Sequence, residues 1–294
     1  MPIISIFDIG TKSLKHYIFR DLSGRPELLL YRRYSEANLG GEALISQATE
    51  NRLLELLRRC LEENRRLGVN LTRVLGTAIF RESAAARELA EKIGKMAGAK
   101  LEILSQDREA FYLYRGFVPQ MAGLGSFAVA NIGGGSTEIA GGEGDNPDWS
   151  KELDFGVNFL RASFGQGKVN WEEIDSYVDK KLEGVAPYQA PFFISGTFDF
   201  LSEVAPKLGI SFSPNHVPGH PLALSPEAYR TFRDKLRAIL PAELAKLYPQ
   251  DPSFTDNVAI SQSVYGRIAE KLRVSAVIPS RNDLVDGVVE EMRG

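Results

Sequence analysis

The sequence predicts a mixed α/β protein made of two similar halves. A short phrase occurs twice, as Ile4–Ser13 and as Phe127–Glu138, and in each copy a strand-like apolar run leads into a glycine turn. The alternation of apolar and polar residues resumes after each turn, which is typical of a β-hairpin. Segments with the patterns of helices and strands then follow each copy. A repeated hairpin with such segments behind it indicates a duplicated domain.

Length and composition agree with two domains. The chain has 294 residues, of which 44% are apolar and 25% charged, enough to bury a sizeable core. No apolar stretch is long enough to span a bilayer, and the N-terminus lacks the basic region and cleavage site of a signal peptide. We therefore expect a cytoplasmic protein with no membrane partner. A net charge of −3 gives no general attraction for nucleic acid.

The first half, residues 1–118, is expected to form one domain. Its predicted elements are three strands in residues 1–34 with turns at 21–24 and 25–26, a helix over 49–67, a strand over 71–77, a helix over 83–96, a strand over 101–104 and a helix over 105–117. Gly68 and Gly98 end the first two helices, and Ser105 is placed to cap the third. Cys60, the single cysteine, falls in the helical apolar pattern, so we expect it to be buried.

The second half, residues 119–294, is expected to form the second domain. Its predicted elements are a connector over 119–125, strands near 127–142 and 151–156, helices near 171–183 and 196–207, a loop over 211–221, helices over 226–240 and 256–272, a strand over 274–278 and a closing helix over 282–294. The closing helix is expected to pack back on the first domain. The apolar face of residues 257–272 fits packing within the chain, with a homodimer contact as the alternative.

Both glycine turns have the composition of a phosphate-binding loop. Glycine permits positive backbone dihedrals and a close approach of the main chain to a ligand, here at Gly10 and at Gly133, Gly134 and Gly135. Successive amide groups in such turns form an anion-binding nest. Hydroxyl donors stand beside them, namely Thr11, Ser13, Ser136 and Thr137. Asp8 is a candidate ligand for a divalent cation. The alternative for either turn alone is a glycine-rich hairpin without a ligand.

Five sequence blocks carry a resemblance to a known family. They are Asp8–Ser13, Gly76–Arg81, Leu104–Ala110, Ile132–Glu138 and Ile194–Thr197, and Asn282–Val289 resembles the family's terminal helix. Their order and spacing are similar to those of the exopolyphosphatase and guanosine pentaphosphate phosphohydrolase family. The resemblance covers nearly the whole chain and looks like the short, two-domain form. It implies an actin-like, ribonuclease H-like duplicated ATPase/phosphatase fold with an interdomain cleft.

The resemblance also implies a reaction and its residues. The family removes a terminal phosphate from polyphosphate or guanosine pentaphosphate with water, and Mg²⁺ is the expected cofactor. Glu109 matches the catalytic glutamate, Glu138 the second carboxylate, and Arg81 an arginine that binds phosphate. Ser195, Gly196 and Thr197 match a further phosphate-binding turn. The implied metal ligands are Asp8, Asn131 and Glu138. Without these motifs, the favoured interpretation would be an ordinary structural role for each: a solvated helix residue for Glu109, a hairpin surface residue for Glu138 and an ion-paired residue at a helix start for Arg81.

Four positions depart from the family pattern. Asn131 replaces an aspartate, which removes a negative charge from the metal site and should weaken metal binding. Arg108 replaces the first of two glutamates; beside Glu109 it would hold that carboxylate ionised and make it a weaker proton acceptor, or it points away. Gln106 replaces a glycine. Lys12 replaces an asparagine and would take over part of the missing charge by binding phosphate.

Three functional hypotheses follow. The first is a phosphohydrolase of the family type that acts on polyphosphate or guanosine pentaphosphate with Mg²⁺. The second is a divergent, weakly active or inactive member that binds polyphosphate, a nucleotide or a protein partner, which Asn131 and Arg108 favour. The third is a small-molecule kinase, since such kinases share this fold. The block around Glu109 and the lack of a sugar-binding signature argue against the kinase.

Overall fold

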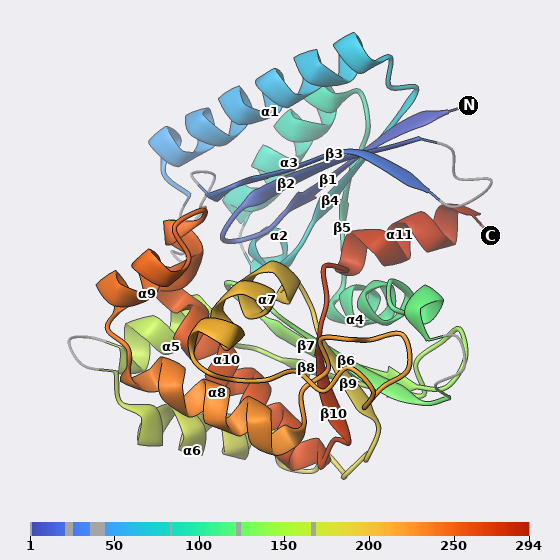
Figure 1. Ribbon diagram of the computed structural model, residues 1–294. Coiled ribbons are helices and arrows are strands. Elements are labelled where there is room, and N and C mark those ends of the chain that lie inside the picture. The colour runs from blue at the N-terminus through green and yellow to red at the C-terminus, as the bar shows by residue number, and fades with distance from the viewer. Residues whose placement is uncertain are drawn as a thin grey trace. The chain divides into compact units, whose positions relative to one another are not determined.

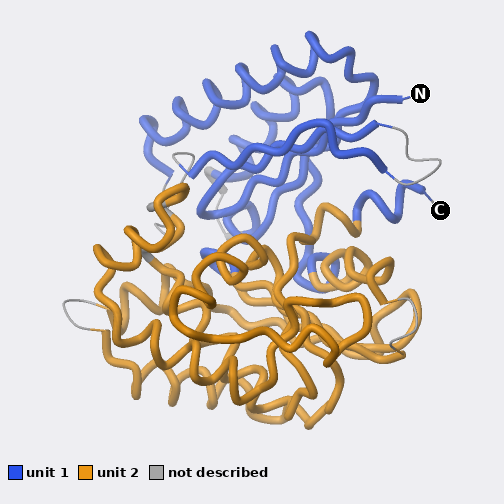
Figure 2. Tube along the Cα trace, viewed as in Figure 1, with its two compact units in different colours: residues 1–109, 133–135, 288–294 blue, residues 110–132, 136–287 orange. Residues whose placement is uncertain are grey.

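The computed structural model describes residues 2–20, 26–35, 45–82, 84–121, 125–165 and 169–293. The chain divides into two compact units, drawn in two colours in Figure 2. Unit 1 comprises Met1–Glu109, Gly133–Gly135 and Val288–Gly294, and unit 2 comprises Ala110–Ile132 and Ser136–Gly287. Position 118, where the sequence places the domain boundary, lies inside unit 2. The expected turn at 21–24 and the first residue of the expected turn at 25–26 lie outside the described residues.

Unit 1 contains a five-stranded sheet in the order β3-β2-β1-β4-β5 (Figure 1). Its strands are β1 (Ile3–Ile9), β2 (Leu14–Arg20), β3 (Glu27–Tyr34), β4 (Leu71–Gly76) and β5 (Leu101–Ile103). The first three form an antiparallel meander, whereas β4 runs parallel to β1 and β5 parallel to β4. The predicted hairpin at the first repeat is confirmed.

Unit 2 repeats this topology in the order β8-β7-β6-β9-β10. Its strands are β6 (Phe127–Ile132), β7 (Thr137–Gly142), β8 (Trp149–Leu153), β9 (Pro191–Ile194) and β10 (Ala276–Pro279). Again three antiparallel strands are followed by two parallel ones. The two sheets are therefore copies of the ribonuclease H-like arrangement of an actin-like fold, as predicted.

Parallel strands bring their carboxyl ends to one edge of a sheet, where ligands bind in α/β proteins. In unit 1 this edge collects the segments after β1, β4 and β5, which hold Gly10–Ser13, Thr77–Arg81 and Ser105–Glu109. In unit 2 it collects the segments that follow β6, β9 and β10. The blocks that carry the family resemblance thus lie at these edges.

The helices of unit 1 follow the predicted pattern closely. They are α1 (Gln47–Leu67), α2 (Ala78–Glu82), α3 (Ala84–Ala97) and α4 (Gln106–Arg115), the last continuing into unit 2. Ser46 caps α1 through its side chain, and Gly68 ends it in the left-handed conformation. The short helix α2 was not predicted, because five residues after a strand carry too little periodicity to recognise.

The helices of unit 2 are α5 (Val157–Phe164), α6 (Trp171–Lys181), α7 (Phe198–Lys207), α8 (Pro226–Ala238), α9 (Pro241–Leu247) and α10 (Pro252–Leu272). The final helix, α11 (Leu284–Arg293), starts in unit 2 and ends in unit 1. The sequence pattern did not predict α5, α9 or β9, each of which has eight residues or fewer. No helix in the described ranges is both long and apolar enough to cross a membrane.

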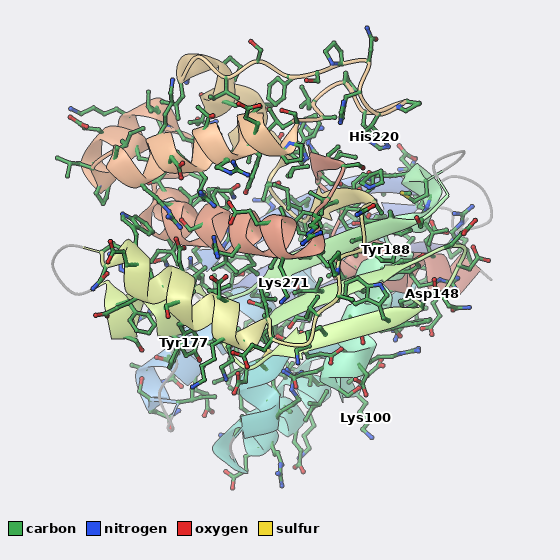
Figure 3. All side chains as sticks on the ribbon, turned by 90° about the horizontal axis from the view of Figure 1, so that it is seen from below. Lys100, Asp148, Tyr177, Tyr188, His220 and Lys271 are labelled. Carbon is green, nitrogen blue, oxygen red and sulfur yellow. The ribbon has the colours of Figure 1, made fainter. Side chains whose placement is uncertain are left out.

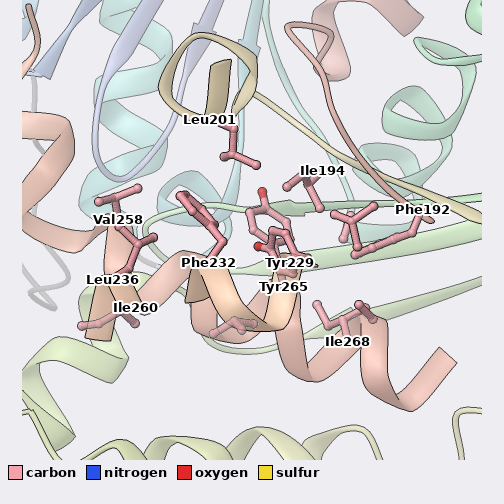
Figure 4. Packing of buried hydrophobic residues seen from close by; sticks show 14 of the residues in the cluster. Phe192, Ile194, Leu201, Tyr229, Phe232, Leu236, Val258, Ile260, Tyr265 and Ile268 are labelled. Carbon is pink, nitrogen blue, oxygen red and sulfur yellow. The ribbon is translucent and has the colours of Figure 1, made fainter. Parts of the chain in front are cut away.

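The sheet of unit 2 is buried on both faces. Alternate residues of β6 enter two different cores: Ala128 and Ala130 belong to one, Phe127 and Val129 to the other. The first core is built with α5 to α8 and α10, and Figure 4 shows its aromatic and aliphatic side chains. In the second core, the rings of Phe193 and His220 meet edge to face, with 5.0 Å between their centroids (His220 is labelled in Figure 3). The predicted loop at 211–221 is thereby fixed: His216 and His220 lie 2.8 and 3.2 Å from the carbonyls of Ser275 and Gln120.

The core of unit 1 packs one face of its sheet against α1 and α3, and Cys60 is buried there as predicted. Close to it lies a buried histidine, His16 of β2, stacked on Phe7 at 4.5 Å. Its Nε2 lies 2.9 Å from Asn64 Oδ1, an acceptor, so Nε2 carries the proton. Its Nδ1 has no hydrogen-bond partner among the described residues and lies 4.0 Å from Glu63. Burial lowers the pKa of His16 below 6.5, although the hydrogen bond to Asn64 and the charge of Glu63 oppose this.

We expect this histidine to make the fold sensitive to acid. The unfolded chain binds a proton at His16 near pH 6.5, and the folded chain does so only at lower pH. The free energy of unfolding should therefore fall as the pH drops below 6.5, by up to about 1.4 kcal/mol per pH unit from this group. Urea unfolding between pH 7.5 and 5 should show a shallower pH dependence for His16→Gln than for the native chain. Equal slopes would contradict this account.

Candidate functional site

The first hairpin holds a buried carboxylate next to a lysine. Asp8 and Lys15 stand opposite each other in the register of β1 and β2, and their side chains form an ion pair of 3.1 Å. Asp8 is 5% exposed. The turn itself is closed by the amide of Gly10, which donates to the carbonyl of Ser13 at 3.0 Å. Thr11 and Ser13 are buried and Lys12 is half-buried.

None of the four glycines in the two turns has a positive φ, and two of them lie close to threonine side chains. Neither Gly10 nor Gly135 adopts a left-handed backbone, so that expectation was wrong for them. A Cβ on Gly10 would lie 3.2 Å from Thr77 Oγ1, and one on Gly135 would lie 3.0 Å from Thr11 Oγ1. Gly133–Gly135 belongs to unit 1 by its contacts. The backbone of the second glycine turn thus lies against the hydroxyl of Thr11.

A buried ion pair joins two of the predicted site residues. Arg81 of α2 donates through Nη1 to the carboxylate of Glu109 in α4 and to the carbonyl of Leu104, 2.6 Å away. Glu109 is 4% exposed, and the side chain of Arg81 is 23% exposed. A buried carboxylate is costly unless it is paired and hydrogen-bonded, and Arg81 meets that requirement. Glu109 is therefore a buried carboxylate held by an ion pair, and it is not a solvated helix residue.

The start of α4 explains how Glu109 is oriented. Ser105 accepts a hydrogen bond from the amide of Arg108 at 3.2 Å, as its predicted capping role requires. The side chain of Arg108 forms an ion pair with Glu291 of α11, and Glu291 also lies 3.6 Å from Arg73. Arg108 was predicted either to hold Glu109 ionised or to point away from it. Its ion pair with Glu291 supports the second alternative.

In the second hairpin the charges are arranged differently. Asn131 and Glu138 stand opposite each other in the register of β6 and β7, at the positions equivalent to Asp8 and Lys15. Asn131 Nδ2 donates to Glu138 at 3.2 Å, and Ser136 Oγ donates to the same carboxylate at 2.5 Å. Glu138 is 2% exposed. The hairpin therefore offers one carboxylate, held by two neutral donors.

Three hydroxyl groups that were predicted to bind phosphate donate to backbone carbonyls. Thr137 Oγ1 donates to the carbonyl of Phe155 at 2.8 Å, just before α5 begins. Ser195 Oγ donates to the carbonyl of Asn282 at 2.9 Å, and Thr197 Oγ1 to that of Ile194 at 2.8 Å. Gly196 between them has a φ of 65°, the left-handed conformation that glycine adopts without strain. These side chains shape the turn that follows β9.

A tyrosine that sequence analysis treated as core connects two of these turns. The hydroxyl of Tyr265 in α10 accepts a hydrogen bond from the amide of Ile132 and donates to the carbonyl of Ser195, both at 3.3 Å. Tyr265 is 2% exposed and lies near Tyr229 in Figure 4. It thus links the end of β6 to the end of β9. Its position on an apolar helix face gave no signal of this role.

The donor groups fit a magnesium ion only in part. Among the described residues, no three histidine, cysteine, aspartate or glutamate side chains gather into a metal-binding group. Each hairpin supplies a single carboxylate, Asp8 or Glu138, and Asp8 is already paired with Lys15. Mg²⁺ is commonly held by one or two carboxylates together with waters and substrate phosphates. The residues therefore fit an ion that arrives with a phosphate, and they do not fit an all-protein cage.

The chain matches the model of a known protein family. The model of the Ppx/GppA phosphatase family matches residues 24–205. The chain belongs to that family. The match includes the strand-end segments with Arg81, Glu109, Asn131 and Glu138.

Curated relatives resemble part of the chain. A guanosine-5'-triphosphate,3'-diphosphate pyrophosphatase from Photobacterium profundum is 25% identical over 190 residues, 63% of this chain and 38% of its own length. A protein of the same name from Aeromonas hydrophila is 29% identical over 173 residues, 58% of this chain and 35% of its own length. The chain thus spans little more than a third of the length of these relatives.

Solved structures resemble the entire chain. A Ppx/GppA enzyme from Aquifex aeolicus superposes with a TM-score of 0.80 at 20% identity and covers 99% of both chains. An exopolyphosphatase from Cytophaga hutchinsonii superposes with a TM-score of 0.84 at 20% identity and covers 99% of this chain and 97% of its own. At this identity the likeness shows the fold.

The link through Tyr265 can be tested by removing its hydroxyl. Tyr265→Phe leaves the amide of Ile132 and the carbonyl of Ser195 without this partner, so we expect a loss of about 1–2 kcal/mol in the free energy of unfolding. Hydrogen exchange at the Ile132 amide should become faster. Tyr229→Phe is the matched control, because Tyr229 donates to Gln262 Oε1 at 2.8 Å in the same core. That variant should lose stability without exposing Ile132; equal exchange at Ile132 in both variants would contradict the link.

Proposed function

We propose that the chain hydrolyses phosphoric anhydride bonds and releases the terminal phosphate of inorganic polyphosphate or of guanosine pentaphosphate. The observation that carries this proposal is the Arg81–Glu109 pair, with Glu109 buried, at the carboxyl edge of a sheet. Membership of the Ppx/GppA phosphatase family supports it. The names of the relatives, a pyrophosphatase and an exopolyphosphatase, support the two substrate classes.

In the proposed reaction Glu109 is the general base. A water molecule attacks the terminal phosphorus, the bond from this phosphorus to the bridging oxygen breaks, and Glu109 accepts the proton that the water loses. The shortened chain leaves with the bridging oxygen. Glu109 suits this role because it is buried in a fixed orientation at the first turn of α4.

Arg81 is proposed to serve both the base and the substrate. Its guanidinium carries five N–H donors, of which Nη1 already contacts Glu109 and Leu104. The remaining donors form a planar fork that matches two oxygens of a phosphate. Binding there would stabilise the charge on the transferring group next to the attacking water. The backbone of Gly10–Ser13 and the side chain of Lys12 are proposed to bind the next phosphate along.

Glu138 and Asp8 are the proposed ligands of Mg²⁺. The ion would neutralise negative charge on non-bridging phosphate oxygens. Ser136 and Asn131 hold the Glu138 carboxylate in one orientation, which is what a metal or water ligand needs. Because Asn131 is neutral, we propose that metal binding is weak in the absence of substrate.

A second candidate function is a member that binds polyphosphate or a nucleotide without turnover. The observation that favours it is Asn131, since the amide donates to Glu138 where an aspartate would add a metal ligand. Arg108 no longer argues for this alternative, because its side chain is paired with Glu291.

Loss of the base separates the two functions. We expect Glu109→Gln to reduce phosphate release from long-chain polyphosphate by at least about 100-fold, the usual contribution of a general base. Asp107→Asn is the matched control, because Asp107 is exposed in the same helical turn and loses the same charge. Release should be measured with and without Mg²⁺, and circular dichroism should show that both variants are folded.

Native release that persists in Glu109→Gln would remove Glu109 from the mechanism. No release by the folded native chain from polyphosphate or from guanosine pentaphosphate would favour the binding function instead.

The missing carboxylate gives a prediction for the metal. Asn131→Asp places two like charges directly opposite each other, so without metal we expect the variant to lose about 0.2–1 kcal/mol of stability. Added Mg²⁺ should restore it, and the thermal midpoint should rise more than in the native chain. Thermal unfolding over a Mg²⁺ titration measures both effects. Titration curves of equal amplitude and midpoint would show that position 131 does not limit metal binding.

A further inference from the structure

A pocket of about 200 Å³ lies between α8 and α10 in unit 2. None of its residues belongs to the strand-end segments described above. Three arginines line it, namely Arg230 and Arg233 of α8 and Arg273 at the end of α10, together with the carboxylate of Glu270. Tyr229 and Val274 contribute apolar wall. A pocket with this excess of guanidinium groups favours an anion.

Arg233 is the best placed of the three arginines. Its side chain is 8% exposed, and its Nε and Nη1 donate to Asp234 at 2.9 Å and to Glu270 at 2.8 Å. No hydrogen bond joins its Nη2, which carries two donors, to another described residue. Gly266 makes room for it, since a Cβ there would lie 2.8 Å from Arg233 Cδ. A buried guanidinium is thus fixed with two donors left over.

The charge of the pocket is not balanced by its own residues. Glu270 is the single acidic side chain of the lining, and it is shared by Arg233, by Arg230 at 3.5 Å and by Arg267 outside the pocket. Three guanidinium groups therefore face one carboxylate that is already bound on several sides. Arg230 and Arg273 are both exposed enough to turn toward a ligand. Even with Asp234, which pairs with Arg233 from outside the lining, the three arginines keep an excess of positive charge that favours an anion.

The size of the pocket restricts the ligand. Sites for drug-sized molecules usually measure about 300–1,000 Å³, and this one is smaller. Guanidinium forks recognise phosphate oxygens in pairs. We propose that the pocket between α8 and α10 is a second anion site, which binds inorganic phosphate or a terminal diphosphate group through Arg230, Arg233 and Arg273. This site is separate from the proposed hydrolytic site and does not depend on it.

The test is a nuclear magnetic resonance titration of the full chain with inorganic phosphate and, separately, with methylenediphosphonate, which is not hydrolysed. The amides of Gly266, Glu270 and Arg273 report on the pocket, and those of Gly10 and Gly135 report on the glycine turns. We expect the pocket amides to shift with a saturable dependence on ligand. Arg230→Gln, an exposed helical residue, should weaken this binding at least tenfold, and Lys271→Gln should not. Lys271 lies on α10 outside the pocket lining (Figure 3).

Saturation by phosphate would identify the free ion as the ligand, whereas saturation by methylenediphosphonate alone would identify a diphosphate terminus. Gly266→Ala supplies a second perturbation, because the added Cβ displaces Arg233 without changing the charge of the protein. The proposal is overturned if the pocket amides do not saturate with either ligand. It is also overturned if Arg230→Gln and Lys271→Gln weaken binding equally, which would indicate attraction to general surface charge.

Discussion

The site depends most on one interaction, the ion pair between Arg81 and Glu109. A carboxylate at 4% exposure cannot remain charged alone, so the position of Glu109 requires the guanidinium of Arg81. That guanidinium is in turn fixed by the carbonyl of Leu104, at the end of β5. The parallel strands β4 and β5 bring both residues to the same sheet edge. The topology of the sheet and the chemistry of the proposed base are thus coupled through one buried pair.

The duplicated hairpins show how a single fold element can be given two electrostatic roles. Equivalent register positions hold an aspartate and a lysine in the first hairpin, and an asparagine and a glutamate in the second. Asp8 is neutralised by Lys15, whereas Glu138 is held by neutral donors. Among the described residues, neither carboxylate belongs to a group of three or more histidine, cysteine, aspartate or glutamate side chains. The proposed metal would therefore enter together with its phosphate ligand.

Much of the fold was predictable from the sequence, since strand alternation, the helix ends at Gly68 and Ser105 and the repeated glycine phrase are local signals. Short elements such as α5 and β9 were missed because eight and four residues repeat the apolar pattern only about twice. The partners of the site side chains could not be predicted from the sequence, because they lie far away along the chain. Arg108 pairs with Glu291, 183 residues away, and Tyr265 reaches Ile132 across 133 residues. The reason for Gly10 and Gly135 was also misjudged, because close packing against Thr77 and Thr11 is a tertiary property.

In the proposed reaction this chain transfers a terminal phosphate to water. The most direct test is to incubate the native chain with long-chain polyphosphate and Mg²⁺ in ¹⁸O-water and to determine the isotope content of the released phosphate by mass spectrometry. Attack of water on the terminal phosphorus predicts one ¹⁸O atom from water in each phosphate released. Unlabelled phosphate, or no phosphate from a protein shown to be folded, would contradict the claim.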